Sequence, residues 1–81
     1  MLRATPDFKS RIYSTGLKMK DLADRAGVNR STLFSWVNTK QKRSIRLNLA
    51  WDVARAYANI EGISKEEAFA RLFIEVEEAP A

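Results

Sequence analysis

Three polar side chains and a run of basic residues are the groups in this sequence best suited to hold a polyanion. Arg30, Ser31 and Ser35 fall on one arc of an expected helix over 30–37, because successive residues of an α-helix are turned by about 100°. A guanidinium group can donate two parallel hydrogen bonds to a planar acceptor, and a serine hydroxyl can donate or accept single ones. The polar segment 38–44 follows directly, and its basic side chains could hold phosphates electrostatically.

The charge of the chain is polarised in a way that fits such a partner. Residues 1–46 contain eleven Lys or Arg and three Asp, a net charge of +8. Residues 47–81 contain three Lys or Arg and seven Asp or Glu, a net charge of −4. This asymmetry suggests a polyanion at the basic end. Charge alone leaves a second interpretation open, in which the surface is uneven but merely solubilising.

The composition argues against several kinds of chemistry. The 81 residues include no Cys and no His, which excludes disulfides, thiolate chemistry, zinc clusters and imidazole catalysis. Glu66 and Glu67 suit the start of a helix electrostatically, and Glu75 suits a solvated surface, so we expect no enzyme and no cofactor. No apolar run approaches the roughly 18 residues that cross a bilayer. We expect a cytoplasmic, nucleoid-associated protein without membrane contact.

Five short helices are expected to position these side chains, since the three glycines fall where helices should end and Asn29 and Ser64 suit helix N-caps. The expected helices cover about 6–15, 19–26, 30–37, a stretch reaching about Asn59, and a fifth that starts after Ser64 and carries its apolar stripe to Val76. The fold class is therefore all-α, a compact five-helix domain over residues 1–81, with flexible ends at 1–5 and 77–81. The expected core residues are Phe8, Ile12, Met19, Leu22, Ala23, Ala26, Val28, Leu33, Trp36, Val37, Leu49, Ala50, Val53, Ala54 and Tyr57.

The segment from Lys18 to Asn38, KMKDLADRAGVNRSTLFSWVN, is expected to form a helix, a glycine-containing turn and a second helix. It resembles the helix-turn-helix family of phage repressors and Cro proteins, the xenobiotic-response-element type. The resemblance covers about residues 6–74 and implies a lambda-repressor-like fold, in which the first helix braces against the DNA backbone and the second enters the major groove. The matching residues are Leu22, Ala23, Gly27, Val28, Asn29, Arg30, Ser31, Thr32, Leu33, Trp36 and Asn38.

The resemblance also implies roles for individual residues. Arg30, Ser31 and Ser35 match base-contacting positions of the family, so Arg30 could contact guanine through O6 and N7 and the serines could bond to bases of either kind. Phe34 could touch a thymine methyl group or pack on a neighbouring protein. Met19 stands where the family usually has a phosphate-contacting Gln, a contact that Lys18 or Lys20 could replace. The expected phosphate-contacting residues are Lys18, Lys20, Asn29, Asn38, Lys40, Lys42 and Arg43.

Two functions stay open from the sequence. The first is a sequence-specific double-stranded DNA-binding transcriptional regulator, a repressor acting as a homodimer on an inverted repeat. The alternative is an antitoxin-like or adapter protein that uses the same fold mainly for protein–protein interaction. The homodimer surface is expected on the fifth helix, although a helix with a wide core-facing stripe would show the same pattern. The residues expected in that surface are Phe69, Leu72, Phe73 and Val76.

Overall fold

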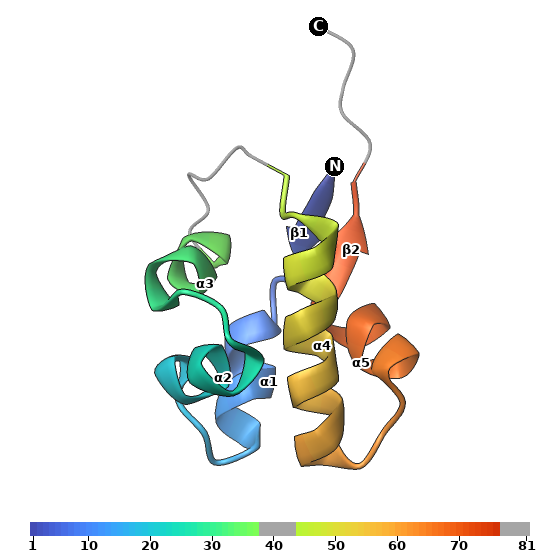
Figure 1. Ribbon diagram of the computed structural model, residues 1–81. Coiled ribbons are helices and arrows are strands. Elements are labelled where there is room, and N and C mark those ends of the chain that lie inside the picture. Colours follow the sequence, from blue (N-terminus) through green and yellow to red (C-terminus); the bar gives the residue numbers. More distant parts are fainter. Residues whose placement is uncertain (38–43, 77–81) are drawn as a thin grey trace, which may run out of the picture.

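The computed structural model describes residues 1–37 and 44–76, which form five helices and a small antiparallel sheet (Figure 1). The five expected helices are all present, so the mostly helical class is confirmed, whereas the sheet was not expected. In chain order the elements are β1 (Leu2–Ala4), α1 (Phe8–Ser14), α2 (Met19–Ala26), α3 (Arg30–Trp36), α4 (Leu47–Glu61), α5 (Lys65–Leu72) and β2 (Phe73–Glu75).

The longest helix, α4, lies between the pair α2 and α3 on one side and α5 on the other (Figure 1). Apolar residues recur along it at spacings of three and four, and Ala50, Val53, Ala54 and Tyr57 are buried as expected. Three of the five buried positions of α4 are alanines, whose small side chains let α2 and α5 both pack closely against it. Gly62 then ends the helix with a left-handed backbone at φ 70°.

The buried side chains form one hydrophobic cluster. Among the expected core residues, Ala26, Trp36, Val37 and Leu49 are only partly buried, at the margin of the cluster. The cluster also includes Leu2 and Ile45, which were not expected there, because neither belongs to an amphipathic helix. The expected core residues that are buried are Phe8, Ile12, Met19, Leu22, Ala23, Val28, Leu33, Ala50, Val53, Ala54 and Tyr57.

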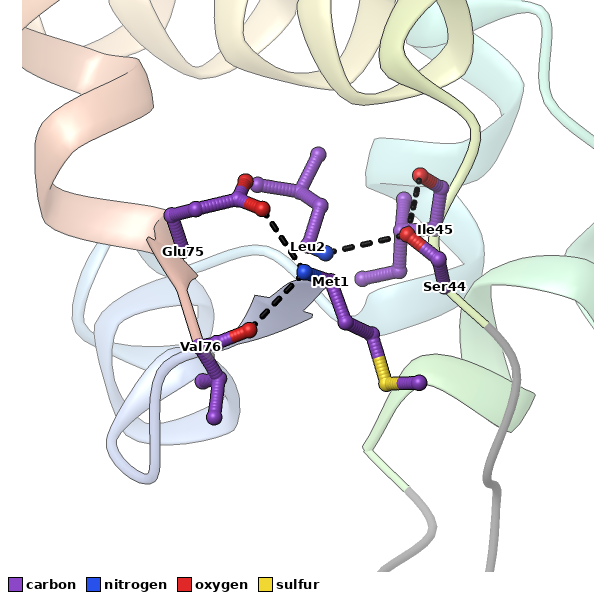
Figure 2. A network of polar contacts seen from close by, with 6 residues as sticks. All are labelled: Met1, Leu2, Ser44, Ile45, Glu75 and Val76. Atoms are coloured by element: carbon purple, nitrogen blue, oxygen red, sulfur yellow. Dashed lines mark hydrogen bonds and ion pairs between the residues drawn. The ribbon is translucent and has the colours of Figure 1, made fainter. Parts of the chain in front are cut away.

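The start of the chain is a strand, which corrects the expectation of a flexible end at residues 1–5. Strand β1 pairs antiparallel with β2, with Arg3 opposite Ile74 at the centre. The Met1 ammonium donates to the Glu75 carboxylate at 2.7 Å and to the Val76 carbonyl at 2.8 Å. Figure 2 shows both contacts at the end of the sheet. The end at 77–81 lies outside the described residues.

The other edge of β1 is held by residues that precede α4. The Leu2 N–H donates to Ser44 Oγ at 2.9 Å (Figure 2), and the Ile45 N–H donates to the Leu2 carbonyl at 2.9 Å. The Leu2 side chain is buried in the core. Hydrogen bonds on both sides, together with this anchor, explain why the segment is extended and paired.

The fifth helix is shorter than expected, because it ends at Leu72 and the chain continues as β2. Phe73 has an extended backbone, with φ −127° and ψ 151°. Aromatic and β-branched residues such as Phe73 and Ile74 fit a strand well, and β1 supplies the hydrogen-bonding partner. The apolar spacing through Val76 predicts a helix, whereas the chain forms a strand from Phe73 to Glu75.

Phe73 is the centre of an aromatic cluster that joins the sheet to three helices. Its ring centroid lies 5.7 Å from that of Phe8, 5.8 Å from that of Trp36 and 5.2 Å from that of Phe69. The contact with Trp36 is edge-on, an arrangement that aromatic pairs favour. The C-terminal end of α3 thus rests on the terminal sheet. Among the described residues, no helix is both long and apolar enough to cross a membrane.

Candidate nucleic-acid interface

Helices α2 and α3 are joined by a turn of three residues whose geometry is specified locally. Gly27 ends α2 in the left-handed region at φ 72°, where a side chain would be strained. The Val28 N–H then donates back to the Ala23 carbonyl at 3.0 Å, which completes the hydrogen bonding of the helix end. Asn29 starts α3, because its side chain accepts from the Ser31 N–H at 2.8 Å. The expected boundaries and the Asn29 cap are confirmed here.

One side of this helix pair is anchored in the core. Met19, Leu22 and Ala23 of α2 are buried, as are Val28 in the turn and Leu33 of α3. Helix α2 packs against both α3 and α4. The orientation of α3 is therefore fixed by its inner side, and its outer side is left to solvent.

The outer arc of α3 carries the residues expected to contact bases. Arg30, Ser31 and Phe34 are exposed, and the Phe34 side chain is 47% exposed. Ser35 differs from this group, because it is only half exposed and its hydroxyl donates to the Thr32 carbonyl at 2.6 Å. The Ser35 oxygen can still accept a hydrogen bond, but its proton is already donated to the Thr32 carbonyl within α3. Three of the four expected base-contacting side chains thus reach solvent from one face of α3.

Arg30 is held by an acidic residue that the sequence analysis did not consider. Its Nε donates to Asp24 Oδ1 at 3.0 Å and its Nη2 donates to Asp24 Oδ2 at 2.6 Å. The side-chain hydrogen bonds of this pair lower the pKa of Asp24 and raise the pKa of Arg30. Both groups are consequently charged at neutral pH. The signal that could have revealed the pair is the spacing of six residues across a tight turn, which brings the last turn of α2 beside the first turn of α3.

The expected phosphate-contacting residues are placed only in part. Lys18 and Lys20 are exposed at the start of α2, and Asn29 is exposed at the start of α3. The Lys18 N–H donates to the Asp21 carboxylate at 3.1 Å, which fixes the first turn of α2 beneath the two lysines. The other expected phosphate-contacting residues, Asn38, Lys40, Lys42 and Arg43, lie outside the described residues.

A polar groove between α3 and the start of α4 adds a basic residue that the sequence analysis missed. The groove measures about 380 Å³, and Thr32, Ser35, Ser44 and Arg46 lie along it. Arg46 is exposed and is the N-cap of α4. Arg46 lies two residues after the basic segment 38–44, so extending that segment to residue 46 includes it among the basic side chains next to α3.

The residues expected to form a dimer surface separate into two groups. Leu72 and Phe73 are buried in the core of the chain, so the expectation that they form an intermolecular surface is wrong for this fold. Leu72 is buried on the inner side of α5 together with Ala68, and Phe73 is buried in β2, where its ring packs against Trp36. Phe69 is half-buried and stacks on Trp51, with ring centroids 4.2 Å apart. Val76 remains 43% exposed, beyond the end of β2.

An apolar groove lies at the opposite end of α3 from Arg30. It measures about 730 Å³ and runs between the sheet, the start of α1 and the end of α3. Ile74 and Val76 contribute exposed side chains to it, and Trp36 and Val37 contribute half-buried ones. Apolar surface of this kind favours contact with another protein over contact with phosphates.

Exposed acidic residues lie on both sides of α4. Glu66 and Glu67 lie in the first turn of α5, on the side of α4 away from α3 (Figure 1). Within the described ranges, no group of His, Cys, Asp or Glu residues could hold a metal ion. Beside α3, the exposed side chains include the cations Lys18, Lys20 and Arg30, the carboxylate of Asp24 and the apolar ring of Phe34. Comparisons of the chain with protein-family models, with curated proteins and with solved structures found no match.

Proposed function

We propose that this protein is a sequence-specific double-stranded DNA-binding regulator of the helix-turn-helix type, with α3 as the element that enters the major groove. The observation that carries the proposal is the outer arc of α3, where Arg30, Ser31 and Phe34 stand exposed on a helix whose inner side is buried. The major groove of B-DNA admits one α-helix and presents a distinct hydrogen-bonding pattern for each base pair. The side chains on this arc offer donors for base edges and an apolar group for a thymine methyl.

The groups around α3 suit the phosphates on either side of such a groove. Lys18 and Lys20 lie at the start of α2, and Arg46 lies at the start of α4. Backbone phosphates are commonly held by cations and by the N-terminal ends of helices. We include Asn29, and we assign the same role to Asn38 on the resemblance and to Lys40, Lys42 and Arg43 on their positive charge next to the expected recognition helix.

The proposal includes repression by covering a promoter, as the simplest mechanism, and a homodimer on an inverted repeat. A two-fold dimer would set two copies of α3 one DNA turn apart, about 34–36 Å. With Leu72 and Phe73 in the core, we move the proposed dimer surface to the exposed Ile74 and Val76 beside the apolar groove.

The test is a selection of bound duplexes from random DNA at physiological salt, followed by sequencing. Enrichment of an inverted repeat with half-sites about ten base pairs apart supports a dimeric regulator. Failure to enrich any sequence contradicts sequence-specific binding.

The variant Arg30→Ala identifies the residue that reads the base. It should relax preference at one position of each half-site, at a cost of about 1–3 kcal/mol in discrimination. Arg55→Ala is the matched control, because Arg55 is exposed on α4 and lies near Lys65 and Glu66 of α5. It removes the same charge away from α3 and should leave the preference intact.

The adapter or antitoxin-like function remains the second candidate, favoured by the exposed Phe34 and the apolar groove. It would be supported if a partner protein still copurified with Arg30→Ala and the unaltered chain enriched no DNA sequence.

A further inference from the structure

The pair between Asp24 and Arg30 uses only one edge of the guanidinium group. Nε and Nη2 form that edge, and each donates to a different oxygen of the carboxylate. A two-point contact of this kind fixes the plane of the guanidinium as well as its position. The first side chain of α3 is thereby ordered before any ligand arrives.

The second edge of the guanidinium, formed by Nη1 and the outer hydrogen of Nη2, has no partner among the described residues. The side chains of Arg30 and Asp24 are 57% and 54% exposed, so this edge is accessible from outside the protein. Guanine accepts two parallel hydrogen bonds at O6 and N7, which is what one guanidinium edge can donate. Arg30 can therefore contact guanine without giving up Asp24.

Asp24 has a second effect on the same surface, because its carboxylate carries a negative charge. A carboxylate beside a DNA-binding helix repels phosphates of any sequence. Because Asp24 already orders the Arg30 side chain, that side chain loses less conformational entropy when it contacts a base. This advantage is gained only on a duplex that offers a guanine in the right place.

We propose that Asp24 is a positioning residue that sets sequence discrimination by holding Arg30 for guanine and by weakening binding to other DNA. This inference rests on the proposed DNA-binding function. Neutralising Asp24 is expected to raise the affinity for DNA in general and to lower the discrimination between sequences. Binding to random duplex becomes tighter, because a repulsive charge is lost, while the advantage of the selected duplex over random duplex becomes smaller.

The experiment measures dissociation constants of the full chain for three duplexes: the selected site, the same site with the guanine read by Arg30 replaced, and a random sequence. In Asp24→Asn the ratio between the replaced and the selected site should fall about threefold to tenfold, the range expected for ordering one flexible side chain. Its binding to the random duplex should tighten. Circular dichroism of each variant checks that the helices are kept.

Asp52→Asn is the control for the loss of one negative charge, because Asp52 lies on α4 and is not part of the pair with Arg30. It should leave the ratio unchanged. Asp24→Asn combined with Arg30→Ala tests whether Asp24 acts through Arg30. In that background the removal of Asp24 should no longer change the ratio.

An unchanged ratio in Asp24→Asn would overturn the inference and leave the proposed function standing. If the ratio is unchanged because all three duplexes bind more tightly by the same factor, the carboxylate only repels DNA or withholds Arg30 from it. A wild-type chain that binds all three duplexes equally would overturn the proposed function together with the inference.

Discussion

The turn between α2 and α3 and the sheet of β1 with β2 support the same helix from its two ends. At the N-terminal end of α3, Asn29 accepts a hydrogen bond from Ser31, two residues further along the chain. At the C-terminal end, Trp36 packs on Phe73, which lies in a strand paired with the first residues of the chain. One end of α3 is thus set by neighbours in sequence and the other by residues from both ends of the chain.

This difference determines how each region can form. A helix cap or a left-handed glycine acts within one turn, so its geometry does not depend on distant segments. The sheet has to close a loop of more than seventy residues before the Met1 ammonium reaches Glu75, and loop closure costs conformational entropy before its contacts form. We therefore expect the α2–α3 segment to be specified locally, while the sheet depends on the assembled core.

The largest expected effect is the truncation of Phe73, which links the two regions. Phe73→Ala should lower the free energy of unfolding by about 3–5 kcal/mol, because it empties the space between Phe8, Trp36 and Phe69. Urea unfolding followed by circular dichroism and tryptophan fluorescence measures this loss.

Ile74→Ala is the matched control, because Ile74 is the next residue of the strand and is 48% exposed. It should cost less than about 1 kcal/mol, since its side chain is only partly removed from water. If Phe73→Ala does not fold, Phe73→Leu retains most of the volume and should give a measurable, smaller loss. Equal losses at Phe73 and Ile74 would contradict the role of the buried Phe73 ring in joining the sheet to the core.

The difference between local and long-range contacts also determines how well the sequence predicts each region. The bounds of α2, the left-handed Gly27, the Asn29 cap and the buried Leu33 are all readable from residues within one or two helical turns. Long-range pairing has no such local signal. Leu2 and Ala4 give a strand only three residues long, and Phe73 continues the helical spacing of Phe69, so the helix was extended too far.

The candidate interface divides in a similar way. The outward position of Arg30, Ser31 and Phe34 follows from helical periodicity, which the structure reproduces. The pairing of Arg30 with Asp24 depends on how two helices meet across the turn, and the inward hydroxyl of Ser35 depends on a rotamer. The six-residue spacing of Asp24 and Arg30 shows that such a pair is possible, but the spacing does not determine how the two helices meet, and no spacing determines the rotamer of Ser35. The reassignment of Phe73 from the surface to the core required β1 to be present.

A smaller loss is expected where the local turn itself is altered. Gly27→Ala should lower the free energy of unfolding by about 1–2 kcal/mol, the cost of a left-handed backbone for a residue with a Cβ. An added Cβ would meet no atom within 4 Å, so sterics outside the residue contribute nothing. Thermal or urea unfolding measures it.

Gly62→Ala offers a direct comparison, because Gly62 ends α4 at φ 70° and Gly27 ends α2 at φ 72°. Both substitutions should cost the same within error if each glycine acts only through its own backbone. A much larger loss at Gly27 would show that its turn depends on distant contacts, which would contradict local specification of the α2–α3 segment.

The cap of α3 should contribute about 1 kcal/mol by the same local reasoning. Asn29→Ala leaves the Ser31 N–H without its acceptor, and such substitutions typically lower stability by about 0.5–2 kcal/mol. Asn29→Ser keeps an acceptor and should be close to the unaltered chain in urea unfolding. Ser64→Ala is a parallel test at α5, where the serine accepts from the Glu67 N–H at 3.1 Å. If Asn29→Ser loses as much as Asn29→Ala, the cap is not the reason for the loss.

The smallest expected effect is at the ion pair that closes the sheet. Glu75→Gln removes the charge that faces the Met1 ammonium, but the Glu75 side chain is 72% exposed, and exposed ion pairs contribute only about 0.2–1 kcal/mol. The strand register should survive, because the ammonium still donates to the Val76 carbonyl and the Val76 N–H still donates to the Met1 carbonyl at 2.8 Å.

Urea unfolding at low and high salt isolates the contribution of the ion pair. Salt should screen the pair in the unaltered chain, so that its free energy of unfolding approaches that of Glu75→Gln. Glu66→Gln on α5 removes an equal charge away from the sheet and should show no such convergence. A loss at Glu75 that matched the loss at Phe73 would mean that electrostatics, and not the buried aromatic cluster, holds the two ends of the chain together beneath α3.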